Sequence, residues 1–362
     1  MTQDVDVLRW GVLGTAGING VVIPAIQASE HGVVTAIASR SLIQAETQAQ
    51  RFDIATAYEG YEQLLADPQV DVVYIPLPNH LHYQWVLAAA AAGKHILCEK
   101  PMAVTAAEAA EMAAAAASAG VLLAEGFMYG HHPRYDLIRN IAHSGEIGQI
   151  RSISASFTFD ASAEMDLVQR ARHPGGGALY DVGCYLTHVA RLVLGSEPTA
   201  VTMAAQWAGP HGEIDMMTAG LVEFGDIPLL MRCAMWSGDE DRVQILGTAG
   251  QIVVPSAFFC APGAEGFTLQ VGEQVREVPV PVVNHFTEQA DDLARAVLFG
   301  DPQRYPSTDA AANLAVIEAC LLSARRRERV LVVPPPTAEA AMTAVSTTLL
   351  SGHGSHSVPS TH

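Results

Sequence analysis

Basic residues and cysteine are scarce in this chain, and both shortages exclude classes of protein. The 362 residues include 20 Lys and Arg against 38 Asp and Glu, a formal net charge of −18. A surface with so few cations is unsuited to nucleic acid or to an anionic membrane. The five cysteines, at positions 98, 184, 233, 260 and 320, form no Cys-x-x-Cys pair. We therefore expect reduced thiols in a cytoplasmic protein.

The sequence also lacks a long apolar run and a basic leader. The longest apolar stretch, from Trp85 to Ala92, is much shorter than the roughly 18 to 20 residues of a membrane-spanning helix. The first residues, Met1 to Asp4, carry an acid and no base, unlike a signal peptide. We expect neither a membrane nor a nucleic acid as partner.

What the first third contains is a regular alternation of strand and helix patterns. Apolar runs predict strands over residues 8–13, 33–38, 71–76, 95–98 and 121–124, and helical patterns cover 18–29, 44–51, 81–92 and 105–119. Thr105 and Glu108 form a capping box at the start of the last helix. This alternation is typical of a Rossmann domain, a doubly wound parallel sheet.

The pattern changes after about residue 146. Strand patterns cover 150–159, 200–207, 218–224, 229–236 and 244–246 between Gly, Pro and Asp turns, and helical patterns cover 178–194, 286–299 and 310–327. This texture predicts an α/β domain with a mostly antiparallel sheet. We place a first domain at 1–128, a second domain at 129–335, and a mobile tail rich in Ser, Thr, Pro, Gly and His at 336–362.

A small-residue turn follows the first predicted strand and opens a helix. It comprises Gly14, Thr15, Ala16, Gly17, Ile18 and Asn19. Small residues before a helix N-terminus let the backbone approach a pyrophosphate. Ala16 and Asn19 stand where the dinucleotide fingerprint has its second and third glycines. The position in a βαβ series nevertheless favours dinucleotide binding over an ordinary tight turn.

The end of the second strand discriminates between NAD and NADP. An NAD site usually has a carboxylate there, whereas the 2′-phosphate of NADP is met by hydroxyls and Arg. This chain has Ser39, Arg40 and Ser41 and no acid. Arg40 can pair with the phosphate and stack on adenine, so we predict NADP in preference to NAD.

Two further strand ends carry polar groups at the same sheet edge, where ligands bind in open α/β folds. One is the segment Leu77-Pro78-Asn79-His80-Leu81-His82, and the other is Glu99-Lys100-Pro101. Pro101 stops its strand and leaves the Lys100 ammonium at the edge. His80 and His82, two residues apart, do not share a helix face, so we expect no metal site.

Three glycines, Gly175 to Gly177, lead into a helix on which Asp181, Tyr185 and His188 recur with helical spacing. Glycines allow close approach of backbone to a ligand. The stripe is either a catalytic face or a buried Asp–Tyr pair that fixes the helix, and spacing alone leaves both open.

These motifs together resemble the glucose-fructose oxidoreductase, inositol dehydrogenase and rhizopine-catabolism (Gfo/Idh/MocA) family. The resemblance spans residues 8 to 333. It includes one more segment, Glu125-Gly126-Phe127-Met128-Tyr129, and the glycine-led segment has the pattern Gly175-Gly176-Gly177-x-x-x-Asp181-x-Gly183-x-Tyr185. It is strongest to the branch of dihydrodiol dehydrogenases, xylose dehydrogenases and keto-reductases of deoxysugar nucleotides.

The resemblance implies that residues 1–128 bind NADP and that residues 129–335 bind the substrate and dimerise. The second domain would have a large open sheet, often a dimer contact, and thus form a homodimer or homotetramer. It implies a nicotinamide-dependent oxidoreductase acting on a carbohydrate. Lys100 would contact the cofactor and the substrate oxygen, Tyr185 would transfer the proton, and Asp181 would orient them. Cofactor contacts would further include Leu77, Pro78, Asn79, His82 and Glu99, and substrate contacts Met128, Arg170, Arg172 and His188. We also expect the Lys100 ammonium to bring the pKa of Tyr185 nearer neutral pH.

Two departures bear on the substrate. Gly130 stands where branch members often have Arg, and the segment from Met165 to Pro174 differs from the usual pattern, so Arg170 or Arg172 takes over that role. The sequence leaves open a free sugar, a nucleotide-linked keto-sugar, elimination driven by transient oxidation with a retained cofactor, or an NADP-sensing protein without catalysis.

Overall fold

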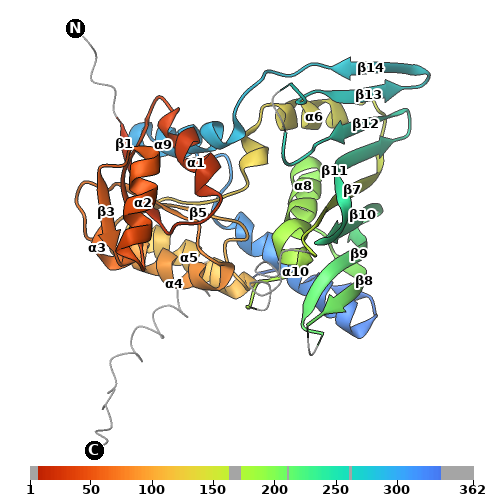
Figure 1. The fold of residues 1–362 in the computed structure, drawn as a ribbon. Helices are drawn as coiled ribbons and strands as arrows, with labels where there is room; N and C mark the ends of the chain where they lie inside the picture. The colour runs from red at the N-terminus through yellow and green to blue at the C-terminus, as the bar shows by residue number, and fades with distance from the viewer. Residues whose placement is uncertain (1–6, 163–172, 210–211, 261–262, 336–362) are drawn as a thin grey trace, which may run out of the picture.

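The computed structural model describes residues 7–162, 173–209, 212–260 and 263–335, and these form two sheets flanked by helices (Figure 1). The first sheet is parallel and six-stranded, in the order β3-β2-β1-β4-β5-β6. Its elements in chain order are β1 (Leu8–Leu13), α1 (Asn19–Gln27), β2 (Gly32–Ser39), α2 (Leu42–Phe52), β3 (Thr56–Glu59), α3 (Tyr61–Leu65), β4 (Val72–Ile75), α4 (Asn79–Ala91), β5 (His95–Cys98), α5 (Ala106–Ala119) and β6 (Leu123–Glu125). The predicted Rossmann arrangement is confirmed.

Burial explains why the apolar runs form central strands. Every residue of β4 is buried, as expected for a strand covered by helices on both faces. The capping box is present at α5: Thr105 Oγ1 accepts from the Glu108 N–H at 3.1 Å, and Glu108 Oε2 accepts from the Thr105 N–H at 3.2 Å. The short edge elements β3 and α3 were not predicted, because four or five residues carry too little periodicity to identify an element.

The second sheet has nine strands in the order β14-β13-β12-β11-β7-β10-β9-β8-β15. One of its strand pairs, β7 with β10, is parallel and the other described pairs are antiparallel, which confirms the mostly antiparallel sheet. The elements are η1 (Met128–His131), α6 (Arg134–His143), β7 (Ile150–Asp160), η2 (Leu179–Gly183), α8 (Cys184–Leu194), β8 (Ala200–Ala208), β9 (Ile214–Phe224), β10 (Ile227–Ala234), β11 (Trp236–Gly247), β12 (Gly250–Pro255), β13 (Phe267–Val271), β14 (Gln274–Val278), α9 (His285–Phe299), α10 (Asp309–Arg326) and β15 (Val330–Leu331).

One face of this sheet packs against helices and the other is open. In β11, Val243 and Ile245 are buried whereas Leu246 is 44% exposed, the alternation of a strand with a single covered face. Helix α8 packs on β7 and α10 on β8 (Figure 1). The helices therefore lie between the second sheet and the Rossmann half.

The C-terminal helices tie the two halves together. Helix α10 packs on α5 and α9 on α1. Thr287 of α9 donates to the Ala25 carbonyl at 3.0 Å, and Ser29 bonds to Asp291. Among the described residues, no helix combines the length and apolarity needed to cross a bilayer. The predicted tail, 336–362, lies outside the described residues.

Candidate active site

The small-residue turn after β1 has a backbone that requires glycine. Gly14 has φ +120°, and a Cβ there would lie 2.9 Å from Leu77 Cδ2. Asn19 is fully buried, and its Nδ2 donates to the Gly14 carbonyl at 2.9 Å and to Gln48 Oε1 at 2.8 Å. The Asn19 side chain therefore holds the turn from behind, and its predicted contact with the cofactor stays a prediction.

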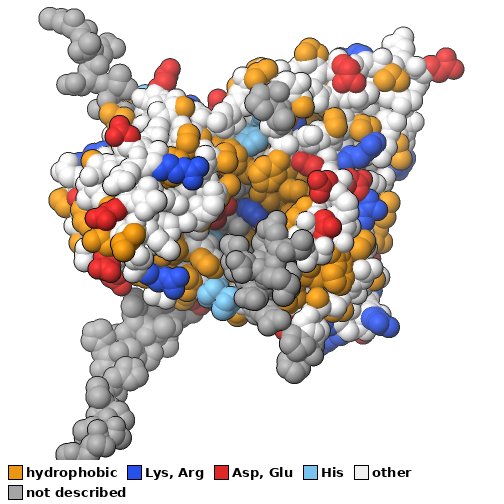
Figure 2. All heavy atoms as spheres, in the orientation of Figure 1, with side chains coloured by type: hydrophobic (Ala, Val, Ile, Leu, Met, Phe, Trp, Pro, Cys, Tyr) orange, Lys and Arg blue, Asp and Glu red, His pale blue; other side chains and the backbone are white. Residues whose placement is uncertain are grey.

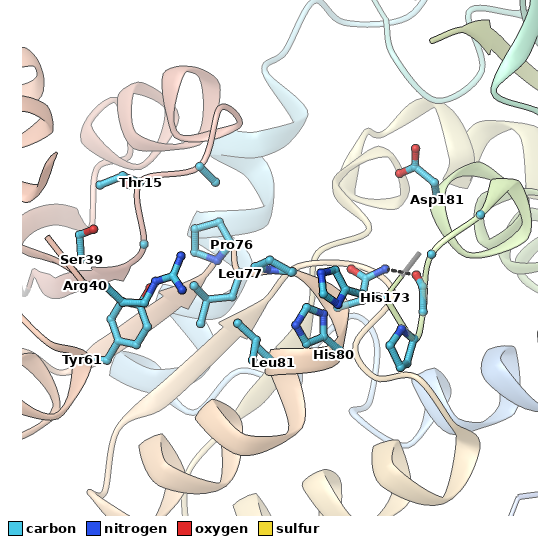
Figure 3. A pocket seen from close by; sticks show the side chains of 18 of the residues that line it. Thr15, Ser39, Arg40, Tyr61, Pro76, Leu77, His80, Leu81, His173 and Asp181 are labelled. Atoms are coloured by element: carbon cyan, nitrogen blue, oxygen red, sulfur yellow. Dashed lines mark hydrogen bonds between the residues drawn. The ribbon is translucent and has the colours of Figure 1, made fainter. Parts of the chain in front are cut away.

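A cavity of about 700 Å³ opens between the two halves, where the surface is visibly hollowed (Figure 2). Ser39, Arg40 and Tyr61 lie at one end of it and Asp181 lies at the other (Figure 3). Predicted cofactor residues that line it are Gly14, Thr15, Ala16, Ser39, Arg40, Leu77, Pro78 and Asn79. Gly17, Ile18 and Ser41 lie on the same segments but are not part of its lining.

The sequence did not identify Tyr61 and Gln44, which also line the Arg40 end of the cavity. Tyr61 lies on α3, an unpredicted element, and its ring meets Trp85 edge-on at 4.8 Å. Burial raises the pKa of Tyr61 and the Arg40 guanidinium opposes this, which reflects how near the two side chains lie. A pairing of Ser and Arg with an aromatic ring suits a phosphorylated adenosine.

The loop after β4 is joined to the glycine loop of the second half. Asn79 Nδ2 donates to the Gly175 carbonyl at 2.7 Å, and the His80 and His173 rings stack at 4.5 Å (Figure 3). A Cβ at Gly175 would lie 3.0 Å from Asn79 Cβ, so glycine permits this approach. These contacts bridge the cavity between the two halves.

His82 lies beneath these loops and not in the cavity. It is fully buried, with Nε2 2.7 Å from the Leu77 carbonyl and Nδ1 3.0 Å from the Pro101 carbonyl. Burial lowers its pKa to about 4, although both carbonyls favour the protonated ring. His82 therefore braces two loops that shape the site, and its predicted contact with the cofactor stays a prediction.

Lys100 lies next to Asp181, which lines the cavity, although Lys100 itself is not part of that lining. Its Nζ donates to the Asp181 carbonyl at 2.6 Å and to Asp181 Oδ1 at 3.1 Å, and lies 5.0 Å from the centre of the Tyr185 ring. Burial opposes the charge of Lys100, but the acidic groups around it, with the Asp181 carboxylate in direct contact, outweigh burial and raise its pKa. The structure thus brings Lys100, Asp181 and Tyr185 together, and Lys100 remains a cation.

Tyr185 does not have the lowered pKa that the sequence predicts. Its phenol is 2% exposed, and burial raises its pKa more than the Lys100 ammonium lowers it. Among the described residues, its hydroxyl has one hydrogen-bond acceptor, the Met128 sulfur at 3.7 Å. A thioether is a weak acceptor, so the protonated hydroxyl is only weakly held.

Two carboxyl groups at the same sheet edge also have shifted pKa values. Glu99 Oε1 accepts from the Tyr74 hydroxyl at 2.7 Å, and burial raises the pKa of Glu99. Glu125, at the end of β6, accepts from the Met102 N–H at 2.7 Å, and burial raises its pKa to about 8. Such shifts are common at functional sites.

The predicted substrate contacts have different outcomes. His188 is 3% exposed and its Nδ1 faces the Tyr129 hydroxyl, so its ring points into the interior and not into the cavity. Met128 is buried against Tyr185. Arg170 and Arg172 lie outside the described residues.

The structure gives a reason for the glycine at position 130. The Tyr305 hydroxyl donates to the Gly130 carbonyl at 2.9 Å, and a Cβ on Gly130 would lie 2.8 Å from that hydroxyl oxygen. Tyr305 therefore fills the space that an Arg side chain at position 130 would need.

Comparisons with known proteins agree with the fold. The family model "Oxidoreductase family, NAD-binding Rossmann fold" matches residues 8–127, and the GFO/IDH/MocA C-terminal domain matches residues 135–253. The chain is 36% identical over 322 residues to D-xylose 1-dehydrogenase (NADP(+)) 2 of Haloferax volcanii, covering 88% of this chain and 97% of that protein. It is 34% identical over 281 residues to trans-1,2-dihydrobenzene-1,2-diol dehydrogenase of Mus musculus, covering 76% and 81%.

A solved structure is also similar over most of the fold. It is a 3-ketoreductase from Actinomadura kijaniata in complex with NADP and TDP-benzene, with a TM-score of 0.82 and 30% identity, covering 88% of this chain and 98% of that one. With both halves matched by family models, the chain belongs to the Gfo/Idh/MocA family of oxidoreductases.

Proposed function

We propose that this protein is an NADP-dependent oxidoreductase that interconverts a secondary alcohol and a ketone on a sugar or sugar derivative, with Tyr185 as the proton donor or acceptor. The observation that carries the proposal is the arrangement of Lys100 between Asp181 and the Tyr185 ring at the carboxyl edge of the Rossmann sheet. Its relatives include an NADP-dependent xylose dehydrogenase and an NADP-bound 3-ketoreductase.

The residues present fit the dinucleotide. The Gly14 turn leaves no room for a Cβ and precedes α1, whose N-terminus favours a pyrophosphate. Arg40 and Ser39 line the far end of the cavity with no carboxylate beside them in its lining, as a 2′-phosphate requires. When bound there, NADPH supplies hydride chemistry at the substrate carbon.

The chain's own residues supply the proton and the charge. Reduction of a ketone creates an alkoxide, which needs a proton donor and a nearby cation. The Tyr185 hydroxyl keeps its proton because burial raises its pKa, and its one acceptor within the described part of the chain is the Met128 thioether. The Lys100 ammonium, held by Asp181, stabilises negative charge on the substrate oxygen.

The test is turnover of Tyr185→Phe with NADPH and a panel of free and nucleotide-linked keto-sugars, followed by absorbance. We expect kcat to fall by on the order of 10²- to 10⁴-fold, the usual contribution of general acid catalysis, with NADPH affinity unchanged. Tyr180→Phe is the matched control, because it removes a buried phenol that donates to the Val104 carbonyl from the same helical segment. Undiminished turnover in Tyr185→Phe would remove Tyr185 from the acid–base role. No NADPH consumption by the unmodified protein across the panel would reject the reductase.

A further inference from the structure

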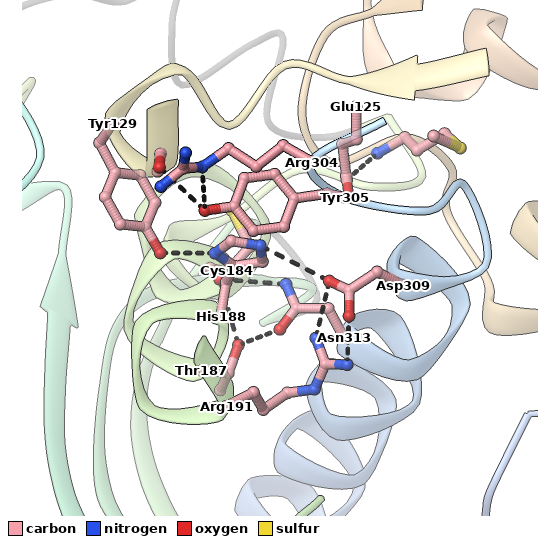
Figure 4. A network of polar contacts seen from close by, with 12 residues as sticks. Glu125, Tyr129, Cys184, Thr187, His188, Arg191, Arg304, Tyr305, Asp309 and Asn313 are labelled. Atoms are coloured by element: carbon pink, nitrogen blue, oxygen red, sulfur yellow. Dashed lines mark hydrogen bonds and ion pairs between the residues drawn. The ribbon is translucent and has the colours of Figure 1, made fainter. Parts of the chain in front are cut away.

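Behind Tyr185, a network of polar contacts runs from η1 to α10 (Figure 4). The Tyr129 hydroxyl lies 2.5 Å from His188 Nδ1, and His188 Nε2 lies 3.5 Å from Asp309 Oδ2. Arg191 donates to both oxygens of Asp309, at 3.0 and 2.7 Å. Three elements far apart in sequence, η1, α8 and α10, are thereby joined.

The charges in this network determine which atoms donate and which accept in its hydrogen bonds. Burial lowers the pKa of His188 to about 4, so its ring is neutral at neutral pH and has one N–H. Burial opposes the charge of Asp309, but the hydrogen bonds from Arg191 outweigh this and lower its pKa. The ring N–H therefore faces the carboxylate at Nε2, which leaves Nδ1 to accept from the Tyr129 hydroxyl.

The network contacts Tyr185 through ring packing and not through a hydrogen bond. The His188 ring stacks on Phe127 at 4.2 Å, and Phe127 meets the Tyr185 ring edge-on at 5.3 Å. The Tyr129 ring lies 5.8 Å from the Tyr185 ring. Of the rings around the Tyr185 phenol, Tyr129 is held by its bond to His188 and Phe127 by its stacking on His188. The rings of Phe157, Phe258 and Phe259 pack on the phenol from other elements.

A second contact fixes the backbone next to Tyr185. Asn313 of α10 donates through Nδ2 to the Cys184 carbonyl at 3.0 Å, and its Oδ1 accepts from Thr187 Oγ1 at 2.9 Å (Figure 4). Helix α8 is therefore restrained in rotation by α10 as well as by η1. Apolar packing alone would bury α8 but would not fix its rotation, because it has no directional bonds.

We propose that Tyr129, His188 and Asp309 are positioning residues that hold the Tyr185 phenol in place for proton transfer. This inference rests on the proposed function, in which Tyr185 is the acid. His188 is thus neither a substrate contact nor a proton donor to substrate. Its contribution is the orientation of a neighbour that must be held within a fraction of an ångström.

The decisive comparison is Tyr129→Phe against Tyr135→Phe. Each variant loses one buried hydroxyl with a single hydrogen bond, since the Tyr135 hydroxyl donates to the Ala257 carbonyl at 2.7 Å. Only the Tyr129 hydroxyl contacts His188. We expect Tyr129→Phe to lower kcat by about 10- to 100-fold, as small misplacements of catalytic groups do. KM for NADPH should stay unchanged, and Tyr135→Phe should retain the kcat of the unmodified enzyme.

Substitutions of His188 add a readout that loss of stability would not give. In His188→Asn the side-chain oxygen occupies the place of Nδ1 and can still accept from Tyr129, whereas in His188→Gln the amide extends toward Asp309. We expect the Asn variant to keep more of kcat than the Gln variant. The kinetic isotope effect with NADPH deuterated at the transferred position should rise in Tyr129→Phe, because a misplaced acid slows the chemical step.

Tyr185→Phe is measured first in the same assay. Undiminished turnover in that variant overturns both the proposed function and the positioning role. If Tyr185→Phe loses turnover while Tyr129→Phe and Tyr135→Phe have equal kcat, the positioning network alone is overturned.

Discussion

Protonation of His82 should destabilise the protein below neutral pH by an amount that its burial predicts. Its pKa is about 4 in the folded chain and about 6.5 in an unfolded chain. The unfolded chain therefore binds a proton that the folded chain rejects, and stability is lost as pH falls from about 6.5 to about 4. Linkage between the two pKa values gives a loss of about 2 kcal/mol at about pH 5 relative to about pH 8.

The assay is urea unfolding of the unmodified protein and of His82→Gln at both pH values. The variant keeps an amide that can donate to one of the two carbonyls but does not titrate. We expect it to be less stable by about 0.5 to 3 kcal/mol at about pH 8, because a flexible amide replaces a fully buried ring. At about pH 5 the difference between the two proteins should shrink by about 2 kcal/mol. All other titrating groups are common to both proteins and cancel in this difference.

A stability difference that is the same at both pH values would refute the reasoning, because it would mean that His82 titrates alike in the folded and unfolded chains. A functional consequence provides a second check. His82 braces Leu77, which lines the cavity, so KM for NADPH should rise in His82→Gln.

Three further substitutions or profiles test other parts of the site. Arg40→Ala should weaken NADPH binding by about 10- to 100-fold, the contribution of charge-assisted hydrogen bonds, and leave the affinity for NADH almost unchanged. Titration with each nucleotide measures both affinities, and an equal loss for both would contradict the NADP assignment. The pH profile of ketone reduction is measured in Glu125→Gln, so that the carboxyl with a pKa of about 8 does not titrate. We expect kcat to stay flat up to about pH 10, because burial keeps Tyr185 protonated where a free tyrosine begins to ionise. A fall in kcat near neutral pH would mean that the effect of Lys100 on the pKa of Tyr185 outweighs burial. Gly177→Ala should destabilise the fold and lower kcat, because the new Cβ would lie 2.0 Å from Asp215 Oδ1. The other oxygen of that carboxylate, Oδ2, accepts from the Leu179 N–H at the start of η2. Gly225→Ala is the control for Gly177→Ala, with a positive φ but no atom within 4 Å of the new Cβ; equal thermal stability of the two variants would show that backbone strain alone matters.

The elements that the sequence predicted are those with a strong local period. The apolar runs of β1, β4 and β5 and the capping box of α5 are sequence-local signals, and all four elements form as predicted. Elements such as α6, β12 and β14 were not predicted. Strand β14 is mostly exposed and polar, so its stability comes from pairing with β13, which no local pattern reports.

Some predictions stay predictions. The roles of Arg170 and Arg172, the domain boundaries and the homodimer or homotetramer are not tested by the structure or by the relatives. The Lys100 contact with Asp181 brings together two predicted residues 81 positions apart, but their part in catalysis awaits the variants above.

The sequence by itself determined the Rossmann alternation, the Lys100 side chain at a strand end and the Asp181–Tyr185 segment after three glycines, because strand ends and helix spacing are local properties of the chain. Only the tertiary structure decided which of these side chains face the cavity. Asn19, His82 and His188 share segments with residues of the site, yet packing against distant elements turns them inward. The same packing raises the pKa of Tyr185 despite the neighbouring ammonium, because desolvation depends on every atom around the phenol and not on its neighbours in sequence.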